Sequence, residues 1–366
     1  MKRRFTYLRF ALAPGGASAK KRIDYFCSVL GLHYLCQWKQ FQMQIYKFNS
    51  ILKPVLWGGD KLVTFKGLPP CDEPIGESWE LSAMPGRESV VDEGDDKGLT
   101  LTQLVERYGA DLVGDAVYHR YGNRFPLLIK LIDAKRDLSI QVHPDDEMAQ
   151  RRHGCSGKNE MWYILHADEG AVIRTGFNVP MTSEGLDRHL ADGTILDVIN
   201  ATESQDGDVF FIPAGQIHTI GAGNMLVEIQ QSSDITYRVW DYNRCDVNGV
   251  LRPLHVQEAH EALDYAARNG HVTDFSCIGP GVTRLLKTPE FDVFRVDVED
   301  DLSQELPEHH SFVAMVCIEG DATIGARCMS TVRVSRGETV LVPAIAAGVS
   351  IRGTARLLVA TIDVDS

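Results

Sequence analysis

The sequence predicts a mainly β protein made of two β-barrels, with a small helical insertion in the first barrel and a degenerate second barrel. Short apolar runs of β type, punctuated by proline and glycine, recur from residue 44 to the end of the chain. A helical pattern interrupts them near 100–121. An internal repeat indicates duplication, because GDVFFIPAGQIHT at 207–219 matches GETVLVPAIAAGV at 337–349 with an offset of 130 residues.

Composition is that of a soluble globular protein of two or three domains, with 366 residues, 44% of them hydrophobic and 8% aromatic. The formal charge of −13 makes nucleic acid and anionic membrane surfaces unfavourable partners, so a bound phosphate needs a local cluster of Lys and Arg. Eight cysteines without a CxxC pair predict free thiols and a cytoplasmic location. No apolar run approaches the roughly 18 residues of a transmembrane helix. The oligomeric state is left open.

Residues 1–42 differ from the rest of the chain in charge. They hold eight Lys or Arg and one acid, a net charge of about +7, whereas the remainder carries about −20. A secretory signal or a transit peptide could explain such a segment, but the apolar stretch is short and broken by Pro14, and Ser is sparse. We expect 1–42 to be a basic extension that is disordered or not part of the native protein. The catalytic domain is then expected at 43–270 and a structural domain at 271–366.

The first half of the chain begins with short β-like runs from Gln44 to Ser82, interrupted by Pro54 and Gly58. The acidic stretch 92–97 predicts a solvated loop. Thr100 can cap a helix with Gln103 completing a capping box and Gly109 ending it. A second helical piece is expected from 112 to 121.

The stretch 124–144 returns to strand, and Lys130 interrupts its nearly continuous apolar sequence. An ammonium group there is costly to bury without a partner, so Lys130 lies either on a solvent face or in a functional cavity. Further helical segments are expected at 145–152, 183–190 and 255–266, and strands near 161–165, 170–176 and 224–241. Glu228 and Gln230 share one face of their strand, which can be solvent or cavity.

Four side chains from three segments form a candidate metal site. Gln141 and His143 are two residues apart in SIQVHP and point to the same face of a strand. Glu160 lies in KNEMWY, and His218 follows the Pro-Gly turn of 207–219. One amide oxygen, two imidazoles and one carboxylate suit one divalent metal, Zn²⁺ above all, with positions open for substrate. His218 alone could instead be a core histidine.

The spacing of Gly207, Pro213, Gly215 and His218 resembles the second motif of the cupin superfamily, whose fold is the jelly-roll barrel. The Gln141, His143 and Glu160 set resembles the first motif, with Gln in place of the usual first His. More narrowly, the chain resembles the type I phosphomannose isomerases in their short bacterial form. The match rests on six blocks at 52–62, 75–82, 126–144, 157–165, 212–223 and 235–244.

The resemblance implies a set of substrate-site residues. Lys130 aligns with a pocket lysine and Arg238 with a catalytic arginine, which makes them the catalytic candidates. Trp57 and Glu77 are placed near the sugar. Ser139, which shares the face of Gln141, and Lys158, a pocket cation, complete the substrate-binding candidates. In the second copy of the repeat Gly348 stands in place of His218, so the C-terminal barrel is expected to be structural.

The implied function is a metal-dependent isomerase that interconverts mannose 6-phosphate and fructose 6-phosphate through an enediolate. Moving a proton between C1 and C2 needs a reversible base and a group that stabilises the developing oxyanion. Lys130, Glu77 and the imidazoles are candidate bases, although an imidazole bound to metal is not free to act. Alternatives are a cupin enzyme of other chemistry, a non-catalytic sugar-phosphate sensor and a storage cupin.

Overall fold

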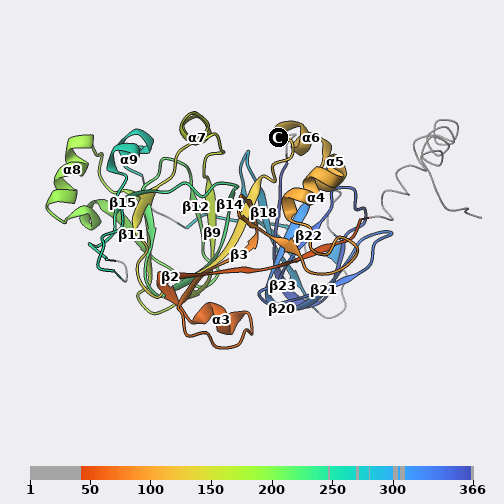
Figure 1. Cartoon of the computed structure of the whole chain (residues 1–366). Coiled ribbons are helices and arrows are strands. Elements are labelled where there is room, and N and C mark those ends of the chain that lie inside the picture. Colours follow the sequence, from red (N-terminus) through yellow and green to blue (C-terminus); the bar gives the residue numbers. More distant parts are fainter. Residues whose placement is uncertain are drawn as a thin grey trace, which may run out of the picture. The chain divides into compact units, whose positions relative to one another are not determined.

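The computed structural model describes residues 43–245, 248–268, 272–279, 281–299, 304–305 and 310–363. The residues from Gln44 onwards form one compact unit (Figure 1). The predicted mainly β class is confirmed, because sheets dominate this unit and the helices are short. The expected basic extension 1–42 lies outside the described residues. Within the described part of the chain, no helix is long and apolar enough to cross a membrane.

Two sheets build the half of the molecule that carries the predicted ligands. The six-stranded sheet has the order β12-β9-β14-β7-β3-β2, with bounds β12 Val209–Ile212, β9 Glu160–Ala167, β14 Asn224–Gln231, β7 Leu127–Asp133, β3 Ile75–Leu81 and β2 Ile51–Gly59. The five-stranded sheet has the order β11-β10-β13-β8-β15, with bounds β11 Ile199–Glu203, β10 Val172–Phe177, β13 His218–Ile220, β8 Ile140–Val142 and β15 Tyr237–Trp240. Ile132 and Trp162 of the first sheet share one buried apolar cluster with Ile173 and Ile220 of the second. The two sheets therefore pack face to face, as in a β-sandwich or flattened barrel.

The C-terminal half is organised around one ten-stranded sheet. Its main path is β16-β17-β18-β23-β20-β22-β1-β6, while β19 and β21 pair at its side. The bounds are β16 Ser276–Gly279, β17 Val282–Lys287, β18 Asp292–Val298, β19 Gln304–Glu305, β20 Val313–Gly325, β21 Val332–Ser335, β22 Thr339–Val342, β23 Ser350–Thr361, β1 Tyr46–Asn49 and β6 Val90–Val91. Strands β1 and β6 come from the start of the chain, so the first described residues pair with the last sheet. A two-stranded ribbon, β4 Ala83–Met84 with β5 Arg87–Glu88, completes the strands described.

The predicted helical insertion is confirmed and lies against the C-terminal half (Figure 1). Helix α4 spans Leu101–Tyr108, with both hydrogen bonds of the Thr100 and Gln103 capping box. The second piece is split at Gly114, whose φ of 96° separates α5 Ala110–Val113 from α6 Asp115–Tyr121. Backbone amides of residues 344 and 345 donate to carbonyls of α5, which docks the insertion onto the turn after β22. The remaining helices are α7 Asp146–His153, α8 Ser183–Ala191, α9 Val256–Ala262 and the 3-10 helix Ile195–Val198.

Two sequence expectations are wrong. The region 44–82 is not entirely β, because α3 spans Lys61–Phe65, and its first turn is held by a hydrogen bond from Leu62 N to the buried carboxylate of Asp133. The acidic loop 92–97 is not fully solvated, since Asp96 is buried. Asp96 accepts hydrogen bonds from the hydroxyls of Tyr46 and Tyr108 and pairs with Arg107. A buried carboxylate is tolerated where such donors satisfy it, which charge runs in a sequence do not reveal.

A buried ion pair joins the two halves behind β3. Lys66, directly after α3, lies 2.7 Å from Glu80 of β3, and their side chains are 6% and 2% exposed. The same ammonium donates to the carbonyl of Gly337, in the turn between β21 and β22. Arg336 donates to the carbonyl of Phe65 and stacks on its ring. The C-terminal half therefore holds the outer face of β3 through a buried ion pair, and contacts α3 through the exposed Arg336.

We expect Lys66→Met to lower the free energy of unfolding by about 3–5 kcal/mol, because it leaves Glu80 buried without its counter-charge. Urea unfolding followed by far-UV circular dichroism measures this loss. The matched control is Lys61→Met, whose pair with Asp168 is 33% and 52% exposed; it should cost under about 1 kcal/mol. Equal losses for the two variants would contradict the buried-pair interpretation.

Candidate metal centre and active site

Strand pairing brings the predicted ligands together between the two sheets. His218 begins β13 and lies directly opposite Gln141 of β8. His143 follows β8, and Glu160 begins β9 in the facing sheet. One ligand atom from each of His143, Glu160 and His218 lies within 4.8 Å of the others, and all three side chains are buried. This geometry suits one small divalent ion.

Backbone carbonyls fix the tautomer of both imidazoles. His143 Nδ1 lies 2.9 Å from the carbonyl of Ile235, and His218 Nδ1 lies 2.8 Å from that of Gln216. A carbonyl only accepts hydrogen bonds, so each Nδ1 carries the proton and each Nε2 presents a lone pair. The Nε2 atoms lie 3.4 and 3.3 Å from the Glu160 carboxylate. Such outer hydrogen bonds are the usual means of orienting histidine ligands.

Burial keeps the ligands in the protonation states that bind metal. It lowers the pKa of His143 to about 3, with help from the Lys158 ammonium. Burial also lowers the pKa of His218. Burial alone would raise the pKa of Glu160, but Lys158 and His143 outweigh it and hold that pKa well below its usual range. At neutral pH the site therefore offers two neutral imidazoles and one carboxylate.

A divalent metal fits this arrangement. Glu160 Oε1 is buried and has no hydrogen-bond donor among the described residues. His218 Nε2, at 3.3 Å, cannot donate because its proton is on Nδ1. A cation would satisfy the orphaned carboxylate oxygen, and N/O donor sets of this kind are typical of zinc.

Gln141 and Ser139 complete the wall beside the ligands. The amide nitrogen of Gln141 lies 3.3 Å from His218 Nε2, and its oxygen accepts a hydrogen bond from the Ser139 hydroxyl at 3.4 Å. A rotation of the amide exchanges its oxygen and nitrogen at nearly constant shape. The structure therefore places Gln141 where it can be the fourth ligand, a role that stays a prediction.

A chain of buried charges runs from the ligands across the six-stranded sheet. Lys158 contacts His143 Nε2 at 3.0 Å and pairs with Glu160 and with Glu228, the latter at 3.2 Å. Lys130 lies 3.2 Å from the same Glu228 and donates to Gln230 at 2.7 Å. Burial opposes the charge of Lys158, but the two carboxylates outweigh it and raise its pKa. Burial raises the pKa of Glu228, against the pull of Lys130 and Lys158.

Glu77 extends the chain to the edge of the sheet. It pairs with Lys53 of β2 at 2.8 Å and accepts a hydrogen bond from Trp79 Nε1 at 2.7 Å. Burial alone would raise the pKa of Glu77, but Lys130 and Lys53 lower it. The lysines 53, 130 and 158 and the glutamates 77, 160 and 228 cancel in charge. A bound divalent metal then leaves the interior with two positive charges, which favours a dianionic ligand.

Arg238 lies beside the ligands on β15, directly opposite Gln141. It donates to the carbonyl of Pro253 at 2.9 Å, while its buried Nε has no partner among the described residues. Burial and the neighbouring guanidinium groups of Arg252 and Arg244 lower its pKa, and the buried Asp241 partly offsets them. Two guanidinium groups share one carboxylate, since Arg244 and Arg252 both pair with Asp241.

The predicted residues differ in how closely they join this network. Gln141, His143, Glu160, His218, Ser139, Lys158 and Lys130 form one connected set through the contacts above. Glu77 is linked to it through Trp79 and Lys130. Trp57 is 5% exposed and packs in the apolar cluster with Ile132 and Trp162. Its proposed contact with sugar stays a prediction.

Glu228 is the residue that sequence reasoning left undecided. Its alternation with apolar neighbours showed only that it faces one side of a strand. The structure places it in the interior between Lys130 and Lys158, 3% exposed. A glutamate in a strand that is apolar on both faces was the available signal, because such a strand has no solvent side.

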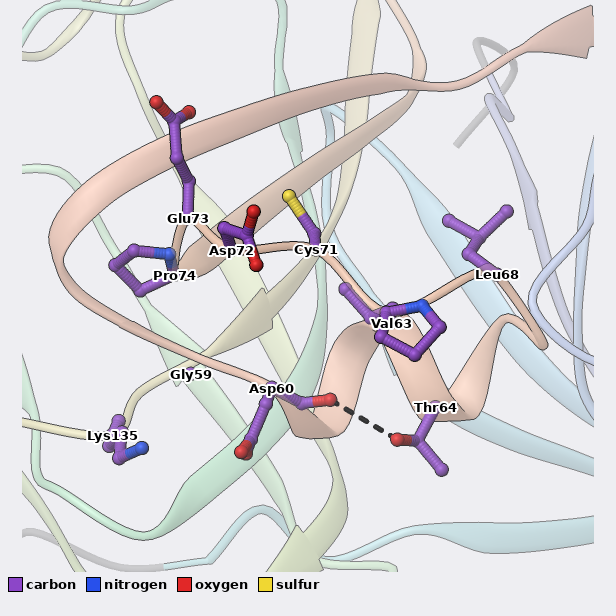
Figure 2. A pocket seen from close by; sticks show the side chains of 11 residues that line it. Gly59, Asp60, Val63, Thr64, Leu68, Cys71, Asp72, Glu73, Pro74 and Lys135 are labelled. Atoms are coloured by element: carbon purple, nitrogen blue, oxygen red, sulfur yellow. Dashed lines mark hydrogen bonds between the residues drawn. The ribbon is translucent and has the colours of Figure 1, made fainter.

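A separate surface pocket of about 460 Å³ lies beside α3 (Figure 2). Its wall combines Asp60, Val63 and Thr64 of the helix region with the loop that carries Cys71, and Lys135 lies at its edge. None of the predicted ligands or substrate residues lines it. The Cys71 thiol is free and exposed, as are those of Cys245 and Cys328. The described cysteine side chains form no disulfide, in agreement with the sequence prediction.

Comparison with known families gives two matches along the chain. Residues 45–177 match the catalytic domain of type I phosphomannose isomerase. Residues 281–362 match the cupin domain of mannose-6-phosphate isomerase.

Individual proteins agree with these families. A mannose-6-phosphate isomerase of Streptococcus mutans is 33% identical over 81% of this chain and 91% of its own length. A putative mannose-6-phosphate isomerase of Bacillus subtilis is 33% identical over 86% of this chain and 98% of its own. The crystal structure of a B. subtilis mannose 6-phosphate isomerase superposes with a TM-score of 0.79 at 32% identity, over 87% of this chain and 100% of that one. A zinc-bound mannose 6-phosphate isomerase, 17% identical, shares the fold with a TM-score of 0.72.

The lowered imidazole pKa values predict an unusually flat pH dependence of metal affinity. Protons compete with zinc for an imidazole only below its pKa, so affinity can fall with pH only where a ligand titrates. Two ordinary histidines with a pKa of about 6.5 would cost about a hundredfold in affinity between about pH 7.5 and about pH 5.5. We expect a loss below about tenfold here, because His143, with its pKa of about 3, stays neutral across that window and the pKa of His218 is lowered. Competition titration against a zinc chelator of known pH dependence measures it, and a hundredfold fall would contradict the prediction.

Proposed function

The chain belongs to the type I phosphomannose isomerase family, and from this premise we propose how its buried site interconverts mannose 6-phosphate and fructose 6-phosphate. The observation that carries the proposal is the convergence of a metal-binding triad with two lysines and a carboxylate inside one apolar barrel. Proton transfer between C1 and C2 needs these components within reach of one sugar. A storage cupin would not need its interior lined with six charges.

His143, Glu160 and His218 would hold the metal, which we take to be zinc, with Gln141 as the proposed fourth ligand. A metal bound there would supply a Lewis acid for the sugar oxygens. Arg238 lies beside Gln141 and directs a guanidinium group at negative charge that develops on the enediolate. Burial strengthens this attraction, because little water is present to screen it.

We assign the proton transfer to Glu228. It is the carboxylate with a raised pKa, so it can take a proton from one carbon and return it to the other near neutral pH. Lys130 and Lys158 each lie 3.2 Å from it and stabilise its ionised form before the first transfer and after the second, while it holds the proton as a neutral acid between them. Glu160 is less suitable, because its charge is committed to metal and to Lys158.

Arg244 and Arg252 are our candidates for the phosphate, because Arg238 is assigned to the enediolate at the other end of the sugar. They carry two positive charges against the single carboxylate of Asp241, in a protein whose net charge is −13. Guanidinium groups bind phosphate oxygens in a bidentate manner. We assign the orientation of the sugar chain between phosphate and metal to the remaining candidates, Ser139, Lys158, Trp57 and Glu77.

Three predictions about domain structure and location belong to this proposal. We propose that the ten-stranded sheet is a second, degenerate cupin barrel. In its support, Gly207 and Gly337 both adopt positive φ, of 91° and 84°, and each precedes a four-residue strand at the offset of 130 residues. We also propose that the enzyme works in the cytoplasm, where its free thiols stay reduced. The domain boundary near residue 271 belongs to the same proposal.

The test of the function is a coupled assay of mannose 6-phosphate conversion before chelation, after chelation and after zinc is restored. We expect chelation to lower turnover at least about a hundredfold and zinc to restore it. His218→Ala should abolish both zinc binding and turnover, whereas His119→Ala, on the exposed face of α6, should leave both unchanged. Full turnover of metal-free protein, or of His218→Ala, would overturn the proposal.

The assignment of Glu228 predicts that Glu228→Gln lowers kcat by about 10²–10⁴ with bound zinc unchanged, because the amide cannot carry the proton. Exchange of the substrate C2 hydrogen with deuterated solvent should be lost in parallel, which a change in binding alone would not cause. Glu203→Gln, on the exposed edge strand β11, is the matched control. A kcat within a few-fold of the parent would assign the base elsewhere.

A further inference from the structure

One row of inward-facing side chains crosses the six-stranded sheet. In the pairing register Phe210, Trp162, Glu228, Lys130 and Trp79 lie opposite one another on adjacent strands. Residues directly opposite in a sheet point to the same face. The Glu228–Lys130 ion pair therefore has an indole on each side of it, Trp162 toward the metal ligands and Trp79 toward the edge of the sheet.

The Trp79 ring lies among three cations. Lys53 Nζ is 4.2 Å from its centroid, Lys130 Nζ is 5.4 Å away and the Arg87 guanidinium is also 5.4 Å away. The residue is fully buried, with no exposed surface. Its Nε1 donates to Glu77, which in turn pairs with Lys53. Cation–π attraction is strongest for tryptophan and for cations removed from water.

Two carboxylates compete for the Lys130 ammonium. Glu228 of β14 lies at 3.2 Å, and Glu77 of β3 is close enough for Lys130 to be the main charge that lowers its pKa. The other groups facing Lys130 are Gln230, which accepts its hydrogen bond at 2.7 Å, and Lys158, which shares Glu228. The N–H of Trp79 and the ammonium of Lys53 both engage Glu77. The ring face of Trp79 lies next to Lys130, so Glu228 and Gln230 remain as the acceptors for the Lys130 ammonium.

We propose that Trp79 is a positioning residue that holds the Lys130 ammonium against Glu228 by offering its ring face and by engaging Glu77. It contacts neither substrate nor metal and acts through Lys130. This inference rests on the proposed function, in which Lys130 stabilises the charge of the proton-transfer carboxylate. It assigns a catalytic consequence to a side chain that would otherwise count as core packing.

A double-mutant cycle between Trp79 and Lys130 tests the inference, with kcat, KM and bound zinc measured for each purified holoenzyme. Trp79→Leu, which removes the aromatic face at a buried site, should lower kcat about tenfold or more and leave KM within about twofold. Trp79→Phe, which keeps a ring face, should recover kcat to within about threefold of the parent. In the Lys130→Met background Trp79→Leu should have no further effect, because residues acting as a unit are not additive.

The controls separate positioning from loss of stability. Val340→Ala opens a cavity in the C-terminal core, and should lower the thermal midpoint without changing kcat. If Trp79→Leu does not fold, Trp79→Met, with a flexible apolar side chain, takes its place in the cycle. Equal losses of kcat from the Trp79 change in both backgrounds would overturn the inference and leave the proposed function intact. Full kcat in Lys130→Met alone would instead refute the role given to Lys130.

Discussion

The structure depends on the pairing of three lysines with three glutamates at the inner face of the six-stranded sheet, four of them buried and two, Lys53 and Glu77, partly exposed. Moving one charge from water into a protein interior costs several kcal/mol, and only close partners offset it. Lys53, Lys130 and Lys158 alternate with Glu77, Glu228 and Glu160 along one sheet, so each charge has a counter-charge as a neighbour. The six charges cancel, so a bound divalent ion would leave the interior doubly positive. The dianionic phosphate of the substrate then meets a site of opposite charge.

Strand register is what makes this neutralisation possible. A shift of one residue between β7 and β14 would turn Lys130 and Glu228 to opposite faces of their strands and separate them. Both strands are buried along their whole length, so such a shift would leave two buried charges without their counter-charges, at a cost of several kcal/mol. The same register places Trp79 and Trp162 on either side of the pair. Ordinary core packing thus determines where the chemistry can occur.

The sequence was informative where function depends on local spacing. Gln141 and His143 share a face because they are two residues apart, and Thr100 with Gln103 specified the start of α4 through a capping box that is local by nature. It was uninformative where a role depends on what lies across the sheet. Glu228 could not be placed, and the burial of Asp96 was missed, because they have partners far away in the chain, Lys130 at 98 residues from Glu228 and Tyr46 at 50 residues from Asp96. Helix α3 was missed for the same reason, since its first turn is held by Asp133.

The C-terminal sheet lacks the histidine of the repeat and supports the site from behind. Strand β3 presents Glu77 and Trp79 to the interior, while Glu80 on its other face is held by Lys66 and through it by Gly337. The turn that carries Gly337 is the counterpart of the turn that carries Gly207 in the metal-binding hairpin. The backbone carbonyl of this second turn accepts the hydrogen bond of Lys66, which in turn pairs with Glu80 of β3. The C-terminal sheet, which has Gly348 at the position of His218, thus contributes backbone contacts that keep β3 in place.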